Sequence, residues 1–160
     1  MLMAFEKLLQ EKEKGKIKTL GVSNFLQEHL DLLRNKLGIL PPVNQLEIHP
    51  YFQQKDLCSF CAEKKICVIA WSPLGRGHEL SDPVIGKISA QMEKTPAQII
   101  LRWHLQQNRG VIPKSIHYDR IRENSEIFDF SLTADQMSLI DALDKSGQNG
   151  RIGPDPLIYP

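Results

Sequence analysis

The sequence has little of what an exported or membrane-bound protein needs. Its 160 residues include only three cysteines, and no apolar run approaches the roughly 18 residues of a membrane-spanning helix. The first seven residues, Met-Leu-Met-Ala-Phe-Glu-Lys, lack the basic start and the apolar core of a signal peptide. We therefore expect a cytoplasmic protein that does not associate with membranes.

An excess of charge of one sign is absent as well. The chain has 20 basic and 19 acidic residues, which gives a net charge of +1. Such a balance creates no overall field that would attract nucleic acid or an anionic membrane. We expect no nucleic-acid partner, and any anion site must be a local feature.

Metal and redox motifs are also scarce. Cys58 and Cys61 form a C-x-x-C, but the surrounding residues 54–64 have a helical pattern and no second pair completes a tetrahedral zinc site. We interpret the two cysteines as small buried residues. The sequence predicts no metal site, and a structural role is expected for three histidines: His29, His49 and His104.

Short β-type runs alternate with helical stretches along the chain. The predicted strands are residues 17–22, 43–48, 66–71 and 111–113. The predicted helices are one that ends at Gly15 and six others at residues 26–37, 54–64, 83–92, 95–107, 120–127 and 133–144. Capping boxes at Thr95 and Thr133 begin two of these helices. Residues 146–160, rich in glycine and proline, are expected to form an extended or loosely packed tail.

This alternation predicts a single α/β domain with parallel strands. The nearly continuous apolar run at residues 66–71 is typical of a strand buried on both faces. Two folds fit the alternation: an open doubly wound sheet, and half of an eight-stranded barrel, which takes about 250 residues when complete. The order of strands and helices does not distinguish the two.

Every predicted strand ends in a cluster of polar residues. Ligands of parallel α/β folds bind at the carboxyl ends of the strands, so these clusters predict a ligand site. The clusters are Ser23 with Asn24, Gln45 with Glu47 and His49, Ser72, and Lys114 with Ser115.

The motifs around these clusters resemble the aldo-keto reductase family. They are Gly-Val-Ser-Asn-Phe at 21–25, Asn-Gln-Leu-Glu-Ile-His-Pro-Tyr at 44–51, Ala-Trp-Ser-Pro-Leu-Gly at 70–75 and Ile-Pro-Lys-Ser at 112–115. Residues 150–156, Gly-Arg-Ile-Gly-Pro-Asp-Pro, are similar to the tail of microbial diketogluconate-reductase-like members. The resemblance implies that residues 1–160 are a single C-terminal half-barrel, about half of a TIM-type (β/α)8 barrel, with residues 146–160 as an extended tail.

The resemblance also implies a site for NADPH or NADP+. The family's cofactor carboxamide would be bound by Ser23, Asn24 and Gln45, and the nicotinamide ring would stack on Trp71, where other members more often have tyrosine or phenylalanine. The residues matched to the pyrophosphate are Ser72, Leu74, Gly75 and Arg76.

The adenosine end of the cofactor matches the last motif and the helix after it. Lys114, Ser115 and Arg120 correspond to the positions that bind the 2′-phosphate, and Glu123 and Asn124 to adenine contacts. Two cations and a hydroxyl at the 2′-phosphate select NADPH over NADH.

The matched motifs do not include the family's catalytic set. In the family an Asp, a Tyr, a Lys and a His catalyse the reduction of a small aldehyde or ketone, and the tyrosine donates the proton. All four belong to the first half of a complete family member. Tyr51, Tyr118 and Tyr159 lie outside that motif, so we assign no catalytic residue. We expect an oxidoreductase half that is inactive alone and works with the missing N-terminal half-barrel or in a homodimer. The alternatives are a non-catalytic NADPH-binding or regulatory module and an unfolded pseudogene product.

Overall fold

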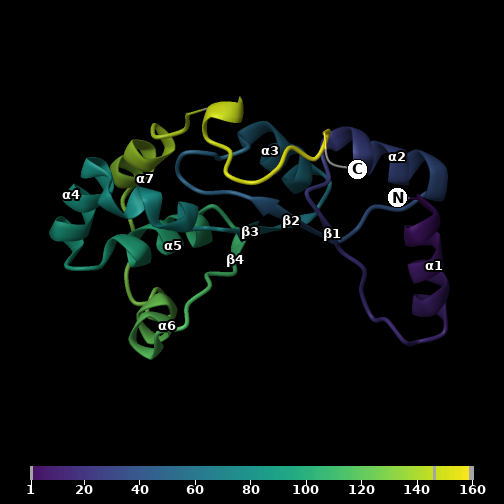
Figure 1. The fold of residues 1–160 in the computed structure, drawn as a ribbon, viewed down its shortest axis with the longest axis horizontal. Helices are drawn as coiled ribbons and strands as arrows, with labels where there is room; N and C mark the ends of the chain where they lie inside the picture. The colour runs from purple at the N-terminus through teal and green to yellow at the C-terminus, as the bar shows by residue number, and fades with distance from the viewer. Residues whose placement is uncertain (1, 146, 159–160) are drawn as a thin grey trace.

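The computed structural model describes residues 2–145 and 147–158, in which helices and strands alternate (Figure 1). No helix in this part of the chain is long and apolar enough to cross a membrane. The elements, in chain order, are α1 (Leu2–Glu13), β1 (Val22–Ser23), α2 (Gln27–Leu37), β2 (Val43–Glu47), α3 (Lys55–Glu63), β3 (Cys67–Trp71), the 3-10 helix η1 (Gly75–Ser81), α4 (Pro83–Met92), α5 (Pro96–Gln106), β4 (Gly110–Val111), α6 (Tyr118–Ser125), α7 (Ala134–Asp141) and the 3-10 helix η2 (Gly147–Asn149).

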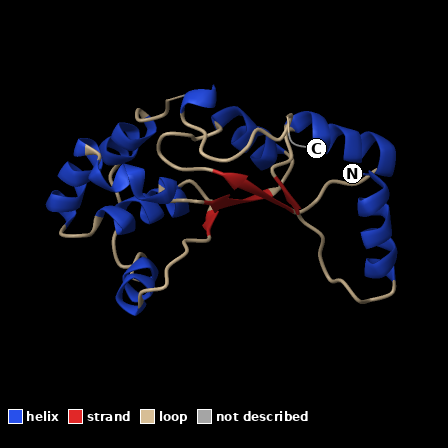
Figure 2. Ribbon diagram, viewed as in Figure 1, coloured by secondary structure: helices blue, strands red, loops and turns tan. Residues whose placement is uncertain are grey.

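The four strands form one parallel sheet in the order β1-β2-β3-β4 (Figure 2). β2 and β3 pair along their whole length, from Val43 opposite Cys67 to Glu47 opposite Trp71. Right-handed crossovers in a sheet whose strand order never reverses place the connecting helices on the same face. This order is that of (β/α) units in a barrel, and it excludes the doubly wound sheet, in which the order reverses.

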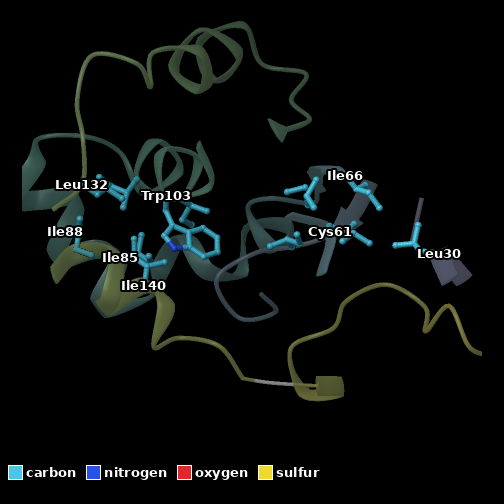
Figure 3. Close-up of a cluster of buried hydrophobic side chains, with 14 residues drawn as sticks. Leu30, Cys61, Ile66, Ile85, Ile88, Trp103, Leu132 and Ile140 are labelled. Carbon is cyan, nitrogen blue, oxygen red and sulfur yellow. The ribbon is translucent and has the colours of Figure 1, made fainter. Parts of the chain in front are cut away.

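The hydrophobic core lies between the sheet and the helices. Leu46, Val68 and Ala70, which alternate along β2 and β3, are at most 6% exposed and pack against buried side chains of the helices. Figure 3 shows Trp103 of α5 within this core, where its Nε1 donates to Asp141 Oδ1 at 2.7 Å. Cys61 is completely buried in the same core, as predicted, whereas Cys58, also predicted to be buried, is only half-buried at its edge.

The opposite face of the sheet is only half-covered. Gln45, Ile69 and Trp71 are half-buried and Cys67 is exposed. The prediction that residues 66–71 are buried on both faces is therefore wrong for the chain as described. The physical reason is that, among the described residues, only the tail near Gly153 covers this face, and it does so only at Glu47 and Trp71.

Several predicted elements differ from the structure by two residues or more at an end, and one of them is the last strand, predicted at residues 111–113 but observed at Gly110–Val111. Residues 17–21 were predicted as strand but are irregular, because β1 pairs with β2 only at Val22 and Ser23. The helix predicted from residue 120 begins two residues earlier, at Tyr118, and the last predicted helix ends at Asp141 instead of residue 144.

The tail packs more tightly than the sequence predicts. Gly150 is buried so closely that an added Cβ would lie 2.0 Å from the carbonyl oxygen of Tyr51. The backbone amides of Ile152 and Gly153 donate to the carboxylate of Glu47. Contacts of this kind fix residues 150–153 although they form no regular structure. Ser146, Tyr159 and Pro160 lie outside the described residues.

The two capping boxes predict a measurable difference in stability. Thr95 Oγ1 accepts from the amide of Gln98 and Thr133 Oγ1 from that of Gln136, but only the Thr95 hydroxyl also donates to Glu123 Oε1, at 2.6 Å. Loss of a cap costs about 1 kcal/mol, and loss of a hydrogen bond to a charged group costs about 1.5–3 kcal/mol. We expect Thr95→Ala to lower the free energy of urea unfolding more than Thr133→Ala does. Equal losses would show that the Thr95–Glu123 contact contributes nothing.

Candidate functional site

The carboxyl ends of the first three strands bring four predicted site residues together. The Ser23 hydroxyl donates to the carbonyl oxygen of Gln45 at 3.1 Å, and the backbone amide of Asn24 donates to the same carbonyl group at 2.8 Å. Trp71 Nε1 donates to Asn24 Oδ1 at 2.8 Å, which fixes the plane of the indole ring. Asn24 has a φ of +58°, a left-handed conformation that asparagine tolerates better than most residues. These contacts hold an aromatic surface beside an amide side chain.

The loop after β3 has an unusual backbone. Ser72, Gly75, Arg76 and Gly77 all have positive φ, between +47° and +93°. At Gly75 a side chain is excluded for a second reason, because an added Cβ would lie 2.5 Å from the carboxylate of Glu79. Non-glycine residues in this conformation are strained, and such strain is concentrated at ligand-binding sites.

A cavity of about 590 Å³ lies between this loop, the end of β4 and α6. Its volume is within the range of about 300–1,000 Å³ that small-molecule sites occupy. Apolar side chains, including Leu80, Ala97 and Ile112, form part of its wall. Eight of the predicted site residues line it: Ser72, Leu74, Arg76, Lys114, Ser115, Arg120, Glu123 and Asn124. The other five do not line it and lie at the strand ends or within the loop: Ser23, Asn24, Gln45, Trp71 and Gly75.

The charges that line the cavity are mostly positive. Arg76, Lys114 and Arg120 are exposed, and in the described part of the chain no carboxylate lies within ion-pair distance of any of them. Glu123 is the acidic residue in the lining, and its carboxylate accepts from the Thr95 hydroxyl. A chain with almost no net charge thus has a local site for an anion.

A buried ion network of three residues lies beneath the loop, and sequence reasoning missed one of them. His49 Nδ1 lies 2.5 Å from Glu79 Oε1, and His49 Nε2 lies 3.3 Å from Glu47 Oε1. All three side chains are at most 1% exposed. The polar cluster of residues 45–49 pointed to Glu47 and His49, but no local pattern distinguishes Glu79 from a surface glutamate. The network joins β2, the loop at Gly75 and the tail held by Glu47.

Mutual interaction sets the protonation of this network. Burial by itself lowers the pKa of His49, but the hydrogen bonds and charges of Glu47 and Glu79 outweigh burial and raise it above 6.5. Burial raises the pKa of Glu47, whereas the hydrogen bonds from His49 and from the tail amides bring it below 4.5. His49, which lies between Glu47 and Glu79, therefore keeps its second ring proton to a higher pH than an ordinary histidine does.

Two further titratable groups near the loop, Tyr51 and His104, have structural roles. The Tyr51 hydroxyl donates a hydrogen bond to Asp82 Oδ2 at 2.7 Å. Burial and this hydrogen bond raise the pKa of Tyr51 to about 12. Burial lowers the pKa of His104 to about 3, so its neutral ring donates from Nε2 to the carbonyl oxygen of Pro73 at 3.1 Å. His104 thereby supports the loop from below, in agreement with the structural role expected for it.

The network predicts a distinctive pH dependence of stability. Because the pKa of His49 is raised in the folded state, its contribution is complete below 6.5 and is lost as the pH rises through the raised pKa. Glu47 acts in the opposite sense: its contribution is present above 4.5 and is lost as the pH falls through its lowered pKa. We expect His49→Gln to lower the free energy of unfolding by about 3–5 kcal/mol near pH 6, because it leaves buried carboxylates without a cation.

The measurement is urea unfolding of the wild type and His49→Gln from pH 5.5 to 9, with the exposed His78→Gln as the control. The difference between the wild type and His49→Gln should shrink as the pH rises, and His78→Gln should follow the wild type. A difference that is constant over this range would rule out a charged His49.

Comparison with known proteins agrees with the site geometry. A sequence model of the Aldo/keto reductase family matches residues 1–145. An aldo-keto reductase of Mycolicibacterium smegmatis is 45% identical over 155 residues, which cover 97% of this chain and 55% of that protein. The methylglyoxal reductase DkgA of Yersinia pestis is 44% identical over 158 residues, covering 98% of this chain and 56% of the relative. The glyoxal reductase of Bacillus subtilis is 46% identical over 153 residues, which cover 96% of this chain and 53% of that protein.

Solved structures extend the similarity to three dimensions. A mutant of Gox0644 in complex with NADPH matches with a TM-score of 0.92 and 44% identity, over 97% of this chain and 56% of that one. An aldo/keto reductase from Brucella melitensis matches with a TM-score of 0.84 and 43% identity, over 88% of this chain and 54% of that one. The chain spans about half the length of the curated relatives it matches, and its parallel (β/α) units form about half of a TIM-type (β/α)8 barrel. By sequence and by structure, the chain belongs to the aldo/keto reductase family.

Proposed function

We propose that this chain is the NADPH-holding half of an oxidoreductase that reduces small aldehydes or ketones to alcohols. The observation that carries the proposal is the cavity beside the loop at residues 72–77, where three unpaired cations and eight of the matched residues converge. The NADPH complex of Gox0644 and the names of the methylglyoxal and glyoxal reductases support the same cofactor and substrate class.

The residues fit an extended dinucleotide. Ser23, Asn24 and Gln45 would bind the carboxamide at the strand ends, and Trp71, held by Asn24, would support one face of the nicotinamide ring. The pyrophosphate would lie along the strained loop, against Ser72, Leu74, Gly75 and Arg76. When bound, NADPH supplies the hydride for carbonyl reduction. The contribution of this chain is to bind and orient it.

The adenosine end would be held at α6. Lys114, Ser115 and Arg120 line the cavity and lie on the segment that runs from the end of β4 to the first turn of α6. The Ser115 hydroxyl accepts from the His117 amide at 3.1 Å, which shapes the turn at the start of the helix. Glu123 and Asn124 follow on α6 and would contact adenine.

Cofactor preference tests the assignment of the adenosine end. We expect the wild type to bind NADPH more tightly than NADH, and the double variant Lys114→Ala/Arg120→Ala to lose about a hundredfold for NADPH with little change for NADH. Each charged hydrogen bond is worth about 1.5–3 kcal/mol, and exposure of both cations favours the lower figure. Fluorescence titration measures both affinities, and Lys36→Ala/Lys87→Ala, at two exposed lysines on other helices, is the matched control. Equal wild-type affinity for the two cofactors would refute the assignment.

Carbonyl reduction also needs a proton donor, and we propose that it comes from a complementary half-barrel. The tyrosines of the described chain are poorly placed for this role: Tyr51 is bound to Asp82, and Tyr118 is 78% exposed and outside the cavity lining. The half-covered sheet face and the edge strands β1 and β4 offer a surface where an N-terminal half or a second copy of the chain would restore a closed barrel.

The poor placement of these tyrosines also favours the alternative of a non-catalytic NADPH-binding module. A turnover measurement separates this alternative from the proposed reductase half. NADPH oxidation is measured with methylglyoxal for the chain alone, for the N-terminal half of a close relative alone, and for the mixture. We expect turnover only in the mixture, because general-acid assistance alone contributes about 100- to 10,000-fold and we assign its donor to the complementary half. Turnover by the chain alone would contradict the proposal, and NADPH binding without turnover in any mixture would favour the module.

A further inference from the structure

A second cavity, of about 680 Å³, lies at the opposite end of the sheet from the cofactor site. It surrounds the first residues of β3 and the turn that precedes β4, whereas the cofactor cavity follows the last residues of the same strands. Its volume is also within the range of small-molecule sites. None of the residues matched to the cofactor lines it.

The most unusual group in this cavity is Arg109. Its side chain is 7% exposed, and its guanidinium carbon lies 4.9 Å from the centre of the Trp103 ring. Nη1 is buried without a hydrogen-bond partner, and no residue in the described ranges accepts a hydrogen bond from any nitrogen of this side chain. Burial lowers the pKa of Arg109, because a buried site disfavours the charged form, and the nearby Asp141 only partly opposes this.

The neighbouring carboxylate does not neutralise Arg109 by direct contact. Asp141 Oδ1 accepts from Trp103 Nε1 at 2.7 Å and from Gln107 Nε2 at 3.0 Å, and no Arg109–Asp141 pair lies within ion-pair distance. A buried guanidinium that has only an aromatic face and a distant carboxylate as partners is costly. An anion in the cavity would remove that cost.

The lining as a whole also favours an anion. Arg109, Lys55 and Lys65 line the cavity together with Asp141. Lys55 is already engaged, because its Nζ lies 3.8 Å from Asp144 Oδ2 and donates to the carbonyl oxygen of Asp141 at 2.9 Å. Arg109 and Lys65 have no carboxylate within ion-pair distance in the described ranges, and the thiol of Cys58 adds no negative charge, since burial raises its pKa. Two cations without an ion-pair partner favour a phosphate monoester, which carries about 1.5 to 2 negative charges at pH 7. A guanidinium also offers paired N–H donors that suit phosphate oxygens.

We propose that this cavity binds the phosphate group of a small phosphorylated metabolite, with Arg109 as its main ligand and Lys55 and Lys65 at its rim. The site is separate from the cofactor cavity and does not depend on the function proposed for that cavity.

The test must remove phosphate binding at the cofactor cavity, so it is made in the Lys114→Ala/Arg120→Ala background. Isothermal titration and thermal unfolding at constant ionic strength are used, with glycerol phosphate, inorganic phosphate and acetate as probes. We expect saturable binding of both phosphates, a rise in the unfolding midpoint with each, and little binding of acetate. Absence of phosphate binding, or acetate binding of equal strength, would overturn the proposal.

Variants of the cavity then identify the ligands. Arg109→Gln should weaken phosphate binding tenfold or more, and Arg109→Lys, which keeps the charge but loses the paired donors, should weaken it less. Arg34→Gln, on the exposed side of α2, is the control and should change nothing. If Arg109→Gln does not fold, Lys65→Gln replaces it and should weaken binding severalfold. Unchanged affinity in Arg109→Lys and Lys65→Gln, or in Arg109→Gln, would show that Arg109 only packs on Trp103.

Discussion

The buried imidazole of His49 holds together two carboxylates from separate parts of the chain. Glu47 belongs to β2, and Glu79 belongs to the 3-10 helix that follows the strained loop. Glu79 occupies the space that a side chain at Gly75 would need, and Glu47 binds the tail amides at Ile152 and Gly153. The loop, the tail and the end of the sheet are therefore positioned by one ion network. This network supports the loop at which we propose that the pyrophosphate binds.

The sheet has two different faces, and the proposed function depends on both. One face is covered by helices and carries the core around Trp103, which stabilises the chain. The other carries Gln45, Ile69 and Trp71, which are half-buried, and Gly153 of the tail packs against Trp71. We propose that the exposed remainder of this face binds a cofactor and a complementary half-barrel. Because the strand order is that of a barrel, this second face would line the inside of a closed barrel. In the account proposed here, a single face thus serves both cofactor binding and assembly.

Local signals in the sequence predicted the elements that local chemistry determines. The capping boxes at Thr95 and Thr133 placed the starts of α5 and α7 correctly, and the apolar runs placed β2 and β3 within one residue. Pairing and burial are properties of distant neighbours, so the short β1 and the exposed Cys67 were not predicted. Glu79 contacts a histidine 30 positions away, and Arg109 depends on a cavity between helices. The motifs predicted which residues gather at the candidate site, but not the network beneath it.

The central claim is that the cations at the start of α6 hold the 2′-phosphate of NADPH. The most direct measurement is ³¹P NMR of NADP+ as a function of pH, with and without the chain. The account predicts that the 2′-phosphate resonance shifts on binding and that its pKa falls, because Lys114 and Arg120 stabilise the dianion. A 2′-phosphate whose resonance and pKa are the same with and without the chain, while the pyrophosphate resonances shift, would contradict it.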